Sequence, residues 1–294
     1  MLAQQLMNGL VAGAVYALFA LGFTLVFGVH RILNLAHGAL LMAGAFIGLY
    51  AVQAGIALWF AVILAMLGAG CTSVLIDILA FRRLRVSGQT EFGAIISSIG
   101  ANLVLVSIAQ RISETKVLRF PFGTFPVMFF RFWGMRVSLL QLIIAGSVAA
   151  LLAGLSWLIF ATSLGRQIRA VAGNPRAAVL LGVDPDGVYR LTFFLSGAMA
   201  GLAGVLVGLS FNSVHFMMGE PYLLRAFVVV ILGGLGSIAG AVVAGLGLGV
   251  LQTLATAYLP SGLTDTIIFS LLFLVLMVRP NGLFGAASAG IGRR

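Results

Sequence analysis

The chain has 294 residues, of which 61% are hydrophobic and 8% are charged, and its mean hydropathy is +1.16. Water-soluble domains carry roughly a quarter charged residues, so this balance excludes a soluble globular protein and predicts a polytopic membrane protein. The formal net charge of +10 does not indicate nucleic-acid binding, because no basic face with interleaved aromatic residues is present. The expected surroundings are therefore membrane lipid.

The first third of the chain contains four apolar segments separated by polar breaks. Residues 8–28 form a first span that is too long for the core of a signal peptide, so we expect it to be retained. After a polar break, residues 34–50 are apolar and rich in glycine, with His37 near their start. Residues 58–79 and 92–109 are long enough to cross the membrane as helices.

The middle of the chain holds a long connection, a span and a polar insert. Residues 110–137 combine polar and aromatic residues, which predicts a loop lying against the membrane interface. Residues 138–160 form another span, and residues 161–187 are a polar, helix-forming insert. This insert separates the two halves of the chain.

The last third opens with a span at residues 188–211 and a polar break at 212–220. Residues 222–232 would be about 16 Å long as a helix, too short to cross a hydrocarbon core of about 30 Å. The sequence Gly-Gly-Leu-Gly-Ser at 233–237 then breaks the helix. The last apolar segments are residues 238–258 and 263–278.

These segments predict an all-α fold, a polytopic transmembrane bundle of about eight to nine spans with short broken segments. Both halves contain a long span, a polar break, a short segment, a long span and a final span, and the two units start in opposite directions. Many transporters contain such an inverted repeat, although glycine- and alanine-rich helices also resemble one another by chance. We expect one domain over residues 1–294, with a first repeat (1–110), a linking span (138–160), a cytoplasmic loop (161–187) and a second repeat (188–285).

Basic residues beside the spans set the expected orientation. With the N-terminus outside, eleven of the seventeen Lys and Arg residues fall inside, including the clusters directly beside spans. The C-terminus and the 161–187 insert are then cytoplasmic. The inner residues are Arg31, Arg82, Arg83, Arg85, Arg166, Arg169, Arg176, Arg190, Arg279, Arg293 and Arg294, and the outer ones are Arg111, Lys116, Arg119, Arg131, Arg136 and Arg225.

Cap signals inside the insert predict a helix of about two turns. Asn174 suits an N-cap, and Pro175 then occupies the first helical position, where its missing N–H costs nothing. Gly182 fits the residue just past the helix end, and Asp184 repeats the cap signal for the next segment. Local chemistry leaves two interpretations open, a helix lying on lipid headgroups or one that docks a soluble partner.

The chain has few groups for catalysis or ion coupling. None of its seven acidic residues is expected at mid-membrane, where proton- or sodium-coupled carriers place ionisable groups. Its three histidines and single cysteine form no metal-ligand or catalytic motif, and Gly-Gly-Leu-Gly-Ser lacks the Lys-Ser/Thr of an ATP site. We therefore expect no catalytic residue, metal or cofactor, and a channel-forming subunit driven by a separate ATPase.

Six stretches run in one order from end to end of the chain, at residues 8–18, 34–38, 164–183, 196–204, 232–240 and 279–285. They include Asn-Leu-Ala-His-Gly at 34–38 and Arg-Pro-Asn-Gly-Leu-Phe-Gly at 279–285. In these stretches the chain resembles the LivH-type permeases, which are permease subunits of ABC importers for branched-chain amino acids.

The resemblance implies an importer in the bacterial inner membrane with two related permeases, two cytoplasmic ATPases and a periplasmic substrate-binding protein. It also implies that the insert helix docks the ATPase, because Ala177-Ala178-x-x-x-Gly182 matches the docking-loop core of ABC importers. That loop usually has Glu before the two alanines, whereas this chain has Arg176. The implied ATPase-coupling residues are Arg169, Asn174, Pro175, Arg176, Ala177, Ala178, Leu181, Gly182 and Asp184.

The substrate and the path remain open at this stage. Related permeases move urea, short amides or other amino acids, and a facilitator that works without ATP is the alternative from another class. The family often has an acid after the His-Gly pair, where this chain has Ala39. We predict the translocation path at two helix breaks, with Asn34, His37 and Gly38 in the first and Gly233, Gly234, Gly236 and Ser237 in the second.

Overall fold

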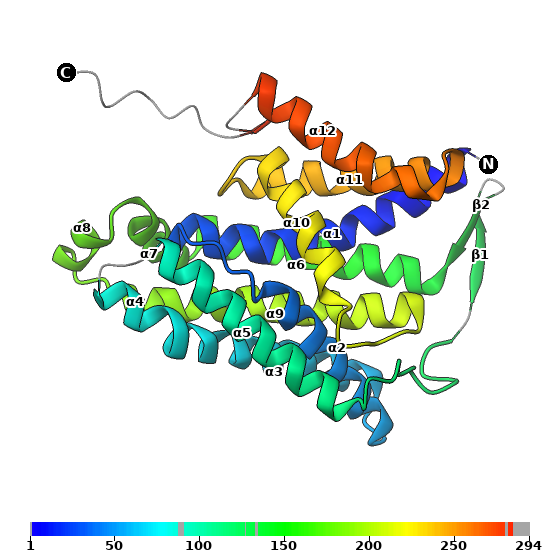
Figure 1. The fold of residues 1–294 in the computed structure, drawn as a ribbon, viewed down its shortest axis with the longest axis horizontal. Helices are drawn as coiled ribbons and strands as arrows, with labels where there is room; N and C mark the ends of the chain where they lie inside the picture. The colour runs from blue at the N-terminus through cyan, green and yellow to red at the C-terminus, as the bar shows by residue number, and fades with distance from the viewer. Residues whose placement is uncertain (1, 88–90, 127, 133–134, 280–281, 285–294) are drawn as a thin grey trace.

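The computed structural model describes residues 2–87, 91–126, 128–132, 135–279 and 282–284, and most of its long helices lie along one axis (Figure 1). The predicted stop at residues 280–281 and the terminal pair Arg293 and Arg294 lie outside the described residues. The elements are α1 (Leu2–His30), α2 (His37–Gln53), α3 (Leu58–Ile76), a π-helical turn (Asp77–Phe81), α4 (Arg82–Ser87), α5 (Glu91–Ile112), β1 (Phe129–Phe132), β2 (Met135–Ser138), α6 (Leu139–Ala161), α7 (Ser163–Gly173), α8 (Pro175–Leu180), α9 (Pro185–Phe211), α10 (Gly219–Gly233), α11 (Ile238–Tyr258), a 3₁₀ turn (Ser261–Leu263) and α12 (Thr264–Val278).

Every apolar segment that the sequence predicts is helical. Among the described residues, six helical stretches are long and apolar enough to cross a membrane, namely α1, α3 with its continuation into α4, α5, α6, α9 and α11. The shorter helices α2 and α10 correspond to the two short segments, and α12 corresponds to the predicted final span at 263–278 but has only 15 residues. The predicted all-α polytopic bundle is therefore confirmed.

Two long helices, α1 and α9, form the centre of the bundle. α1 packs against α11, while α9 packs against α2 and α3. Glycine allows the backbones to touch, because a Cβ added at Gly44 of α2 would lie 2.2 Å from the Cα of Gly201 in α9. Such close packing holds helices together in lipid, where no hydrophobic driving force between them exists.

The middle of the chain contains two elements that the sequence did not predict. The connection at 110–137 was expected to be a loop, but it includes the antiparallel hairpin β1–β2, in which Phe130 pairs with Val137. Strand β2 leads directly into α6, whose N-cap Ser138 forms a capping box with Gln141. The second element is α7, which precedes the predicted short helix α8.

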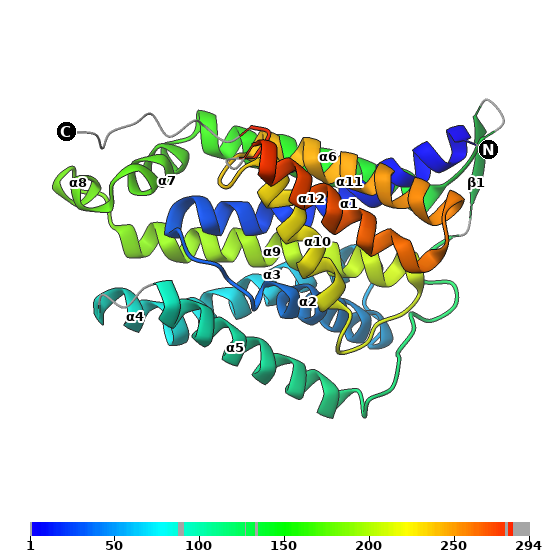
Figure 2. The same ribbon diagram turned by 45° about the horizontal axis from the view of Figure 1, so that its top comes forward.

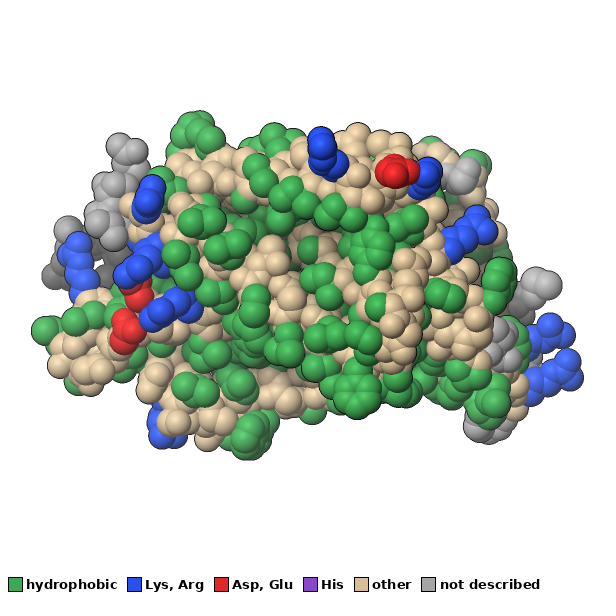
Figure 3. All heavy atoms as spheres, turned by 90° about the horizontal axis from the view of Figure 1, so that it is seen from below, with side chains coloured by type: hydrophobic (Ala, Val, Ile, Leu, Met, Phe, Trp, Pro, Cys, Tyr) green, Lys and Arg blue, Asp and Glu red, His purple; other side chains and the backbone are tan. Residues whose placement is uncertain are grey.

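The two ends of the bundle carry different elements. Helices α4, α7 and α8 lie at one end, which we call the α8 end, and the hairpin β1–β2 lies at the other, beside the start of α1 (Figures 1 and 2). On the face drawn in Figure 3, basic and acidic side chains cluster at the α8 end, and the middle of the face is largely apolar. An apolar band between charged ends suits a bundle that is embedded in lipid.

Candidate functional site

Helix α8 begins and ends as the sequence predicts. The Asn174 side chain accepts hydrogen bonds from the N–H groups of Arg176 (3.0 Å) and Ala177 (3.1 Å). Gly182 has a φ of +81°, the left-handed conformation of a residue just past a helix end. Asp184 caps α9 in the same way, accepting two backbone hydrogen bonds of 3.0 Å. The predicted helix is confirmed, and its docking role stays a prediction.

The two faces of α8 differ in burial. Ala178 is only 2% exposed and packs into a small apolar cluster with residues of α1, α7 and α9. Leu180 and Leu181, in contrast, are 88% and 80% exposed. The exposed surface of α8 and of the residue after it therefore includes this leucine pair with Arg176, Ala177 and Val179, while Ala178 holds the helix to the bundle.

Arg169 and Pro175 have structural roles at this end. The Arg169 guanidinium donates to the carbonyl of Ile159 in α6 and lies 5.9 Å from the ring of Phe160. A Cβ added at Gly165 would lie 2.1 Å from the Ile159 oxygen, so α7 lies tightly against the last turns of α6. Pro175 occupies the first position of α8 and separates it from α7.

Four charged side chains, which we call the ion-pair cluster, connect the start of α9 to α3 and α4. Asp77 is fully buried in the π-helical turn, and its carboxylate accepts two hydrogen bonds from Arg85, of 2.5 and 3.3 Å. Asp186, in the first turn of α9, lies 3.7 Å from Arg85 and accepts a 3.2 Å hydrogen bond from Arg82. π-helical turns occur frequently at functional sites.

An aromatic contact extends this cluster to α1. The Arg85 guanidinium lies 4.6 Å from the centre of the Tyr189 ring. The His30 ring also packs against Tyr189, with the two ring centres 4.2 Å apart. His30 Nε2 is also 3.0 Å from the Thr192 hydroxyl. The first turns of α9 thus contact α1, α3 and α4 directly after α8. The sequence placed Arg82 and Arg85 among the inner basic residues, but no local pattern could pair them with Asp186, which lies more than a hundred residues further along the chain.

The first predicted path break is packed inside the protein. His37 is 1% exposed, its Nε2 donates to the Phe19 carbonyl over 3.1 Å, and the two rings are stacked 4.4 Å apart. Asn34 is 2% exposed, and its side-chain oxygen accepts a 3.1 Å hydrogen bond from the Ala36 N–H. Both side chains hold the turn between α1 and α2, and neither lines a described cavity.

The second predicted break is a tight turn between α10 and α11. Gly234 and Gly236 have φ values of +98° and +85°, and the Ser237 hydroxyl caps α11 by accepting from the Gly240 N–H at 3.1 Å. A Cβ added at Gly233 would lie 2.4 Å from the backbone of Gly240. Gly236 and Ser237 also line a groove of about 700 Å³ between α6 and α11.

The structure does not bring the two predicted breaks together, because they lie at opposite ends of α10. Gly38 touches Gly219 at the start of α10, where a Cβ on either glycine would come within 3.0 Å of the other's carbonyl oxygen. At the other end, the N–H groups of Leu283 and Phe284 bond to the carbonyls of the last two residues of α10, at 2.8 and 3.2 Å. The prediction of a path through both breaks remains untested.

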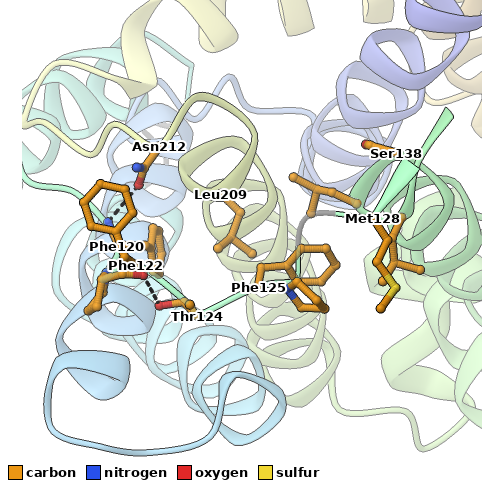
Figure 4. Close-up of a pocket in the computed structure, with 13 residues that line it drawn as sticks. Phe120, Phe122, Thr124, Phe125, Met128, Ser138, Leu209 and Asn212 are labelled. Atoms are coloured by element: carbon orange, nitrogen blue, oxygen red, sulfur yellow. Dashed lines mark hydrogen bonds between the residues drawn. The ribbon is translucent and has the colours of Figure 1, made fainter. Parts of the chain in front are cut away.

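A cavity of about 310 Å³ lies under the aromatic loop at the hairpin end (Figure 4). We call it the loop cavity. Phe120 is anchored by its N–H, which donates to the Asn212 side chain over 3.0 Å, and Thr124 donates to the Pro121 carbonyl. Leu209 of α9 and Ser138, just before α6, line the opposite side.

A second cavity, of about 370 Å³, lies between α1, α6, α9 and α10. We call it the tyrosine cavity, because Tyr16 and Tyr222 line it with their rings 5.8 Å apart. Its rim carries Asn8, whose side-chain oxygen accepts a 3.1 Å hydrogen bond from Gln141. Both cavities are lined in part by Ser138 and Leu140, so the two adjoin. The sequence did not predict either cavity.

Comparison with known proteins places the chain in a family. Residues 5–278 match the family described as branched-chain amino acid transport system / permease component. The chain is 33% identical, over 96% of its length and 95% of the relative's, to the high-affinity branched-chain amino acid transport system permease protein LivH of Escherichia coli. It is equally similar to BraD of Pseudomonas aeruginosa, and 28% identical to the probable LivH of Methanocaldococcus jannaschii over 91% of this chain and 88% of the relative. The chain therefore belongs to the family of permease components of branched-chain amino acid transport systems.

Proposed function

We propose that this chain is the membrane-spanning permease subunit of an ABC importer and moves branched-chain amino acids into the cytoplasm. The observation that carries the proposal is the end-to-end similarity to permeases of that name, over 96% of the chain. The exposed, doubly capped α8 supports it, because two leucines that are 88% and 80% exposed suit insertion into a groove on a soluble partner.

The proposed partners follow the importer architecture. Two cytoplasmic ATPases hydrolyse ATP, a second related permease completes the pathway, and a periplasmic binding protein delivers the substrate. The chain itself then contributes a path and a docking element and carries out no catalysis. Because the binding protein supplies most of the affinity, transient contacts in the permease are enough.

The geometry of the α8 end suggests how ATP hydrolysis would move the spans. A displacement of α8 is passed to α9 through the short linker that ends at Asp184, and from α9 to α3 and α4 through the ion-pair cluster. Arg85 and Asp77 form the buried part of that cluster, with side chains 17% and 1% exposed, so solvent screens their attraction little. Helices α3 and α9 would therefore move together.

We also propose that the α8 end faces the cytoplasm and that the N-terminus lies outside. The support is the bias of basic residues, which lie in or next to the helix ends found there, namely Arg31, Arg82, Arg83, Arg85, Arg166, Arg169, Arg176 and Arg190. In a Cys71→Ser background, an Arg166→Cys variant in sealed cells should resist a membrane-impermeant thiol reagent, whereas Phe122→Cys should react. The opposite labelling pattern would overturn the orientation.

The predicted inverted repeat stays part of the proposal and gains support from packing. In the repeat, α1, α2 and α3 correspond to α9, α10 and α11. The packing of α1 against α11 then matches that of α9 against α3, and the contact of α2 with α3 matches that of α10 with α11. Arg31 and Asn212 are each the first residue after a long helix, and both have a positive φ, of 54° and 44°. Arg31 precedes Gly38 by the same number of residues as Asn212 precedes Gly219, and these two glycines touch. A pseudo-twofold axis between Gly38 and Gly219 would explain these correspondences.

Co-purification tests the proposed function directly. The detergent-solubilised chain should bring two ATPase subunits and a second permease in fixed ratio, and proteoliposomes of that complex with its binding protein should import leucine only with ATP. Urea and short amides serve as competitors that discriminate the substrate alternatives. A chain that purifies alone and still transports leucine in liposomes would establish the facilitator instead.

A further inference from the structure

Arg225 is a basic residue placed inside the bundle. The sequence grouped it with the outer charges, but it lies in α10 with its guanidinium 5.7 Å from the ring of Tyr16, the central residue of the 29-residue helix α1. Its side chain is 22% exposed, and Asp265 is its ion-pair partner at 3.9 Å. An arginine at this depth is costly, so such residues mark substrate or ion pathways more often than they serve packing.

Arg225 lies next to the two tyrosines that line the tyrosine cavity. Its guanidinium lies 5.9 Å from the ring of Tyr222 as well, so Arg225 is close to both tyrosines that line the cavity, although it does not line the cavity itself. The Gln252 side chain lies beside the Tyr16 hydroxyl. Within the described part of the chain, Arg225 Nε and Gln252 Oε1 are both buried without a hydrogen-bond partner.

Both residues lie beside Tyr16, and two unpartnered buried polar groups next to one side chain indicate a missing ligand or water. Their chemistry is complementary to a zwitterion, because a guanidinium N–H donates to a carboxylate and an amide oxygen accepts from an ammonium. Apolar side chains, including Val15, Ile144 and Val207, line part of the cavity beside them. A volume of about 370 Å³ is at the small end of the range for ligand pockets, which suits a ligand the size of a single amino acid.

We propose that this place is the permease's own substrate station for an aliphatic α-amino acid. Arg225 receives the carboxylate, the Gln252 oxygen and the tyrosine faces receive the ammonium, and the wall of Val15, Ile144 and Val207 holds the branched side chain. The substrate enters from the hairpin end through the loop cavity, passes Ser138 and Leu140, and reaches the tyrosine pair, whose rings part to admit the carboxylate. The inference rests on the proposed function and adds where the substrate is bound.

Uptake by the complete importer in proteoliposomes provides the first test. Arg225→Gln should lower ATP-driven leucine uptake at saturating binding protein by about tenfold or more, because an ionic hydrogen bond contributes about 1.5–3 kcal/mol. Arg225→Lys should retain part of the uptake rate, since lysine keeps the positive charge but cannot form the two parallel hydrogen bonds of a guanidinium to a carboxylate. Arg111→Gln, at the exposed end of α5, is the matched control and should leave uptake unchanged.

Protection of a thiol tests the same station in a chain that keeps Arg225. In a Cys71→Ser background, Ser210→Cys places a thiol in the tyrosine cavity and Thr124→Cys places one in the loop cavity. Leucine should slow modification of the first thiol several-fold and leave the second unchanged, and leucinol, which lacks the carboxylate, should protect neither. Adding Arg225→Gln should abolish the protection.

The outcomes separate the two proposals. If the unmodified complex imports no branched-chain amino acid, the proposed function fails and this station fails with it. If the complex imports leucine but Arg225→Gln matches the wild-type rate, or leucine leaves the Ser210→Cys thiol unprotected, the station is wrong while the proposed function stands. Loss of uptake with carboxylate-dependent protection supports the station.

Discussion

The α8 end and the tyrosine cavity contrast in how their residues come together. At the α8 end, each helix start and stop is set by residues within four positions, such as Asn174 with the N–H groups of Arg176 and Ala177. The tyrosine cavity is built from four helices, and Tyr16 meets Tyr222 across more than two hundred residues of chain. The docking element is therefore specified locally, and the binding place is specified only by assembly of the bundle.

The largest expected effect tests whether the exposed leucines of α8 serve a partner. Replacing Leu180 and Leu181 together by Asp should abolish ATP-driven uptake and ATPase co-purification, because charges cannot enter an apolar groove without a large desolvation cost. Both side chains are more than three-quarters exposed, at 88% and 80%, so the chain should still insert and fold. The control is Val117→Asp in the connection after α5, where the side chain is 56% exposed and lines neither the loop cavity nor the tyrosine cavity. Normal uptake by the leucine variant would exclude α8 as the docking element.

The second prediction tests the link between the two regions. Asp77→Asn leaves the buried Arg85 without its ionised partner, so it should destabilise the detergent-solubilised protein by about 3–5 kcal/mol. Arg82→Gln, which removes the more exposed pair with Asp186, should cost at most about 1 kcal/mol. Thermal unfolding of both variants measures the difference. Equal losses would show that burial does not distinguish the two halves of the ion-pair cluster.

The smallest effect compares two N-caps at opposite ends of the molecule. Asn174→Ala and Ser138→Ala each remove a side-chain acceptor that caps a helix, so each should cost about 1 kcal/mol. Asn174→Ala should reduce the uptake obtained per ATP hydrolysed, because α8 transmits the ATPase motion. Ser138→Ala, on the proposed substrate route, should instead change uptake and hydrolysis in proportion. Coupled uptake and hydrolysis assays on both variants check this. A similar loss of coupling in Ser138→Ala would mean that helix caps matter here for stability alone.

Much of the fold could be predicted because hydrophobicity and cap residues act over short distances. The length of the apolar segments predicted the membrane spans. The capping residues Asn174, Gly182 and Asp184 predicted both ends of α8 and the start of α9. The hairpin β1–β2 was missed because aromatic and basic residues at an interface form loops and strands alike. Helix α7 was missed because its cap, Thr162, is the only residue between α6 and α7, so no polar break in the sequence separates the two helices.

The functional residues were harder to predict. The glycine-rich breaks include places of close backbone contact, as at Gly233 and Gly38, and neither of these two glycines lines a described cavity. Arg225 was grouped with the outer charges because its depth depends on how α10 crosses α1, which no local pattern records. The ion pairs of Asp186 with Arg82 and Arg85 emerged only from the fold, because they join residues that are far apart in the sequence.

The hydrogen bonds from Leu283 and Phe284 to the end of α10 affect the order in which the protein can mature. During synthesis, α10 leaves the ribosome about fifty residues before these two donors, so its last two carbonyls are at first without these protein partners. The second half of the bundle can reach its final form only after residue 284 has been translated. A chain that stops at Arg279 should therefore insert its spans but remain a target for membrane quality control.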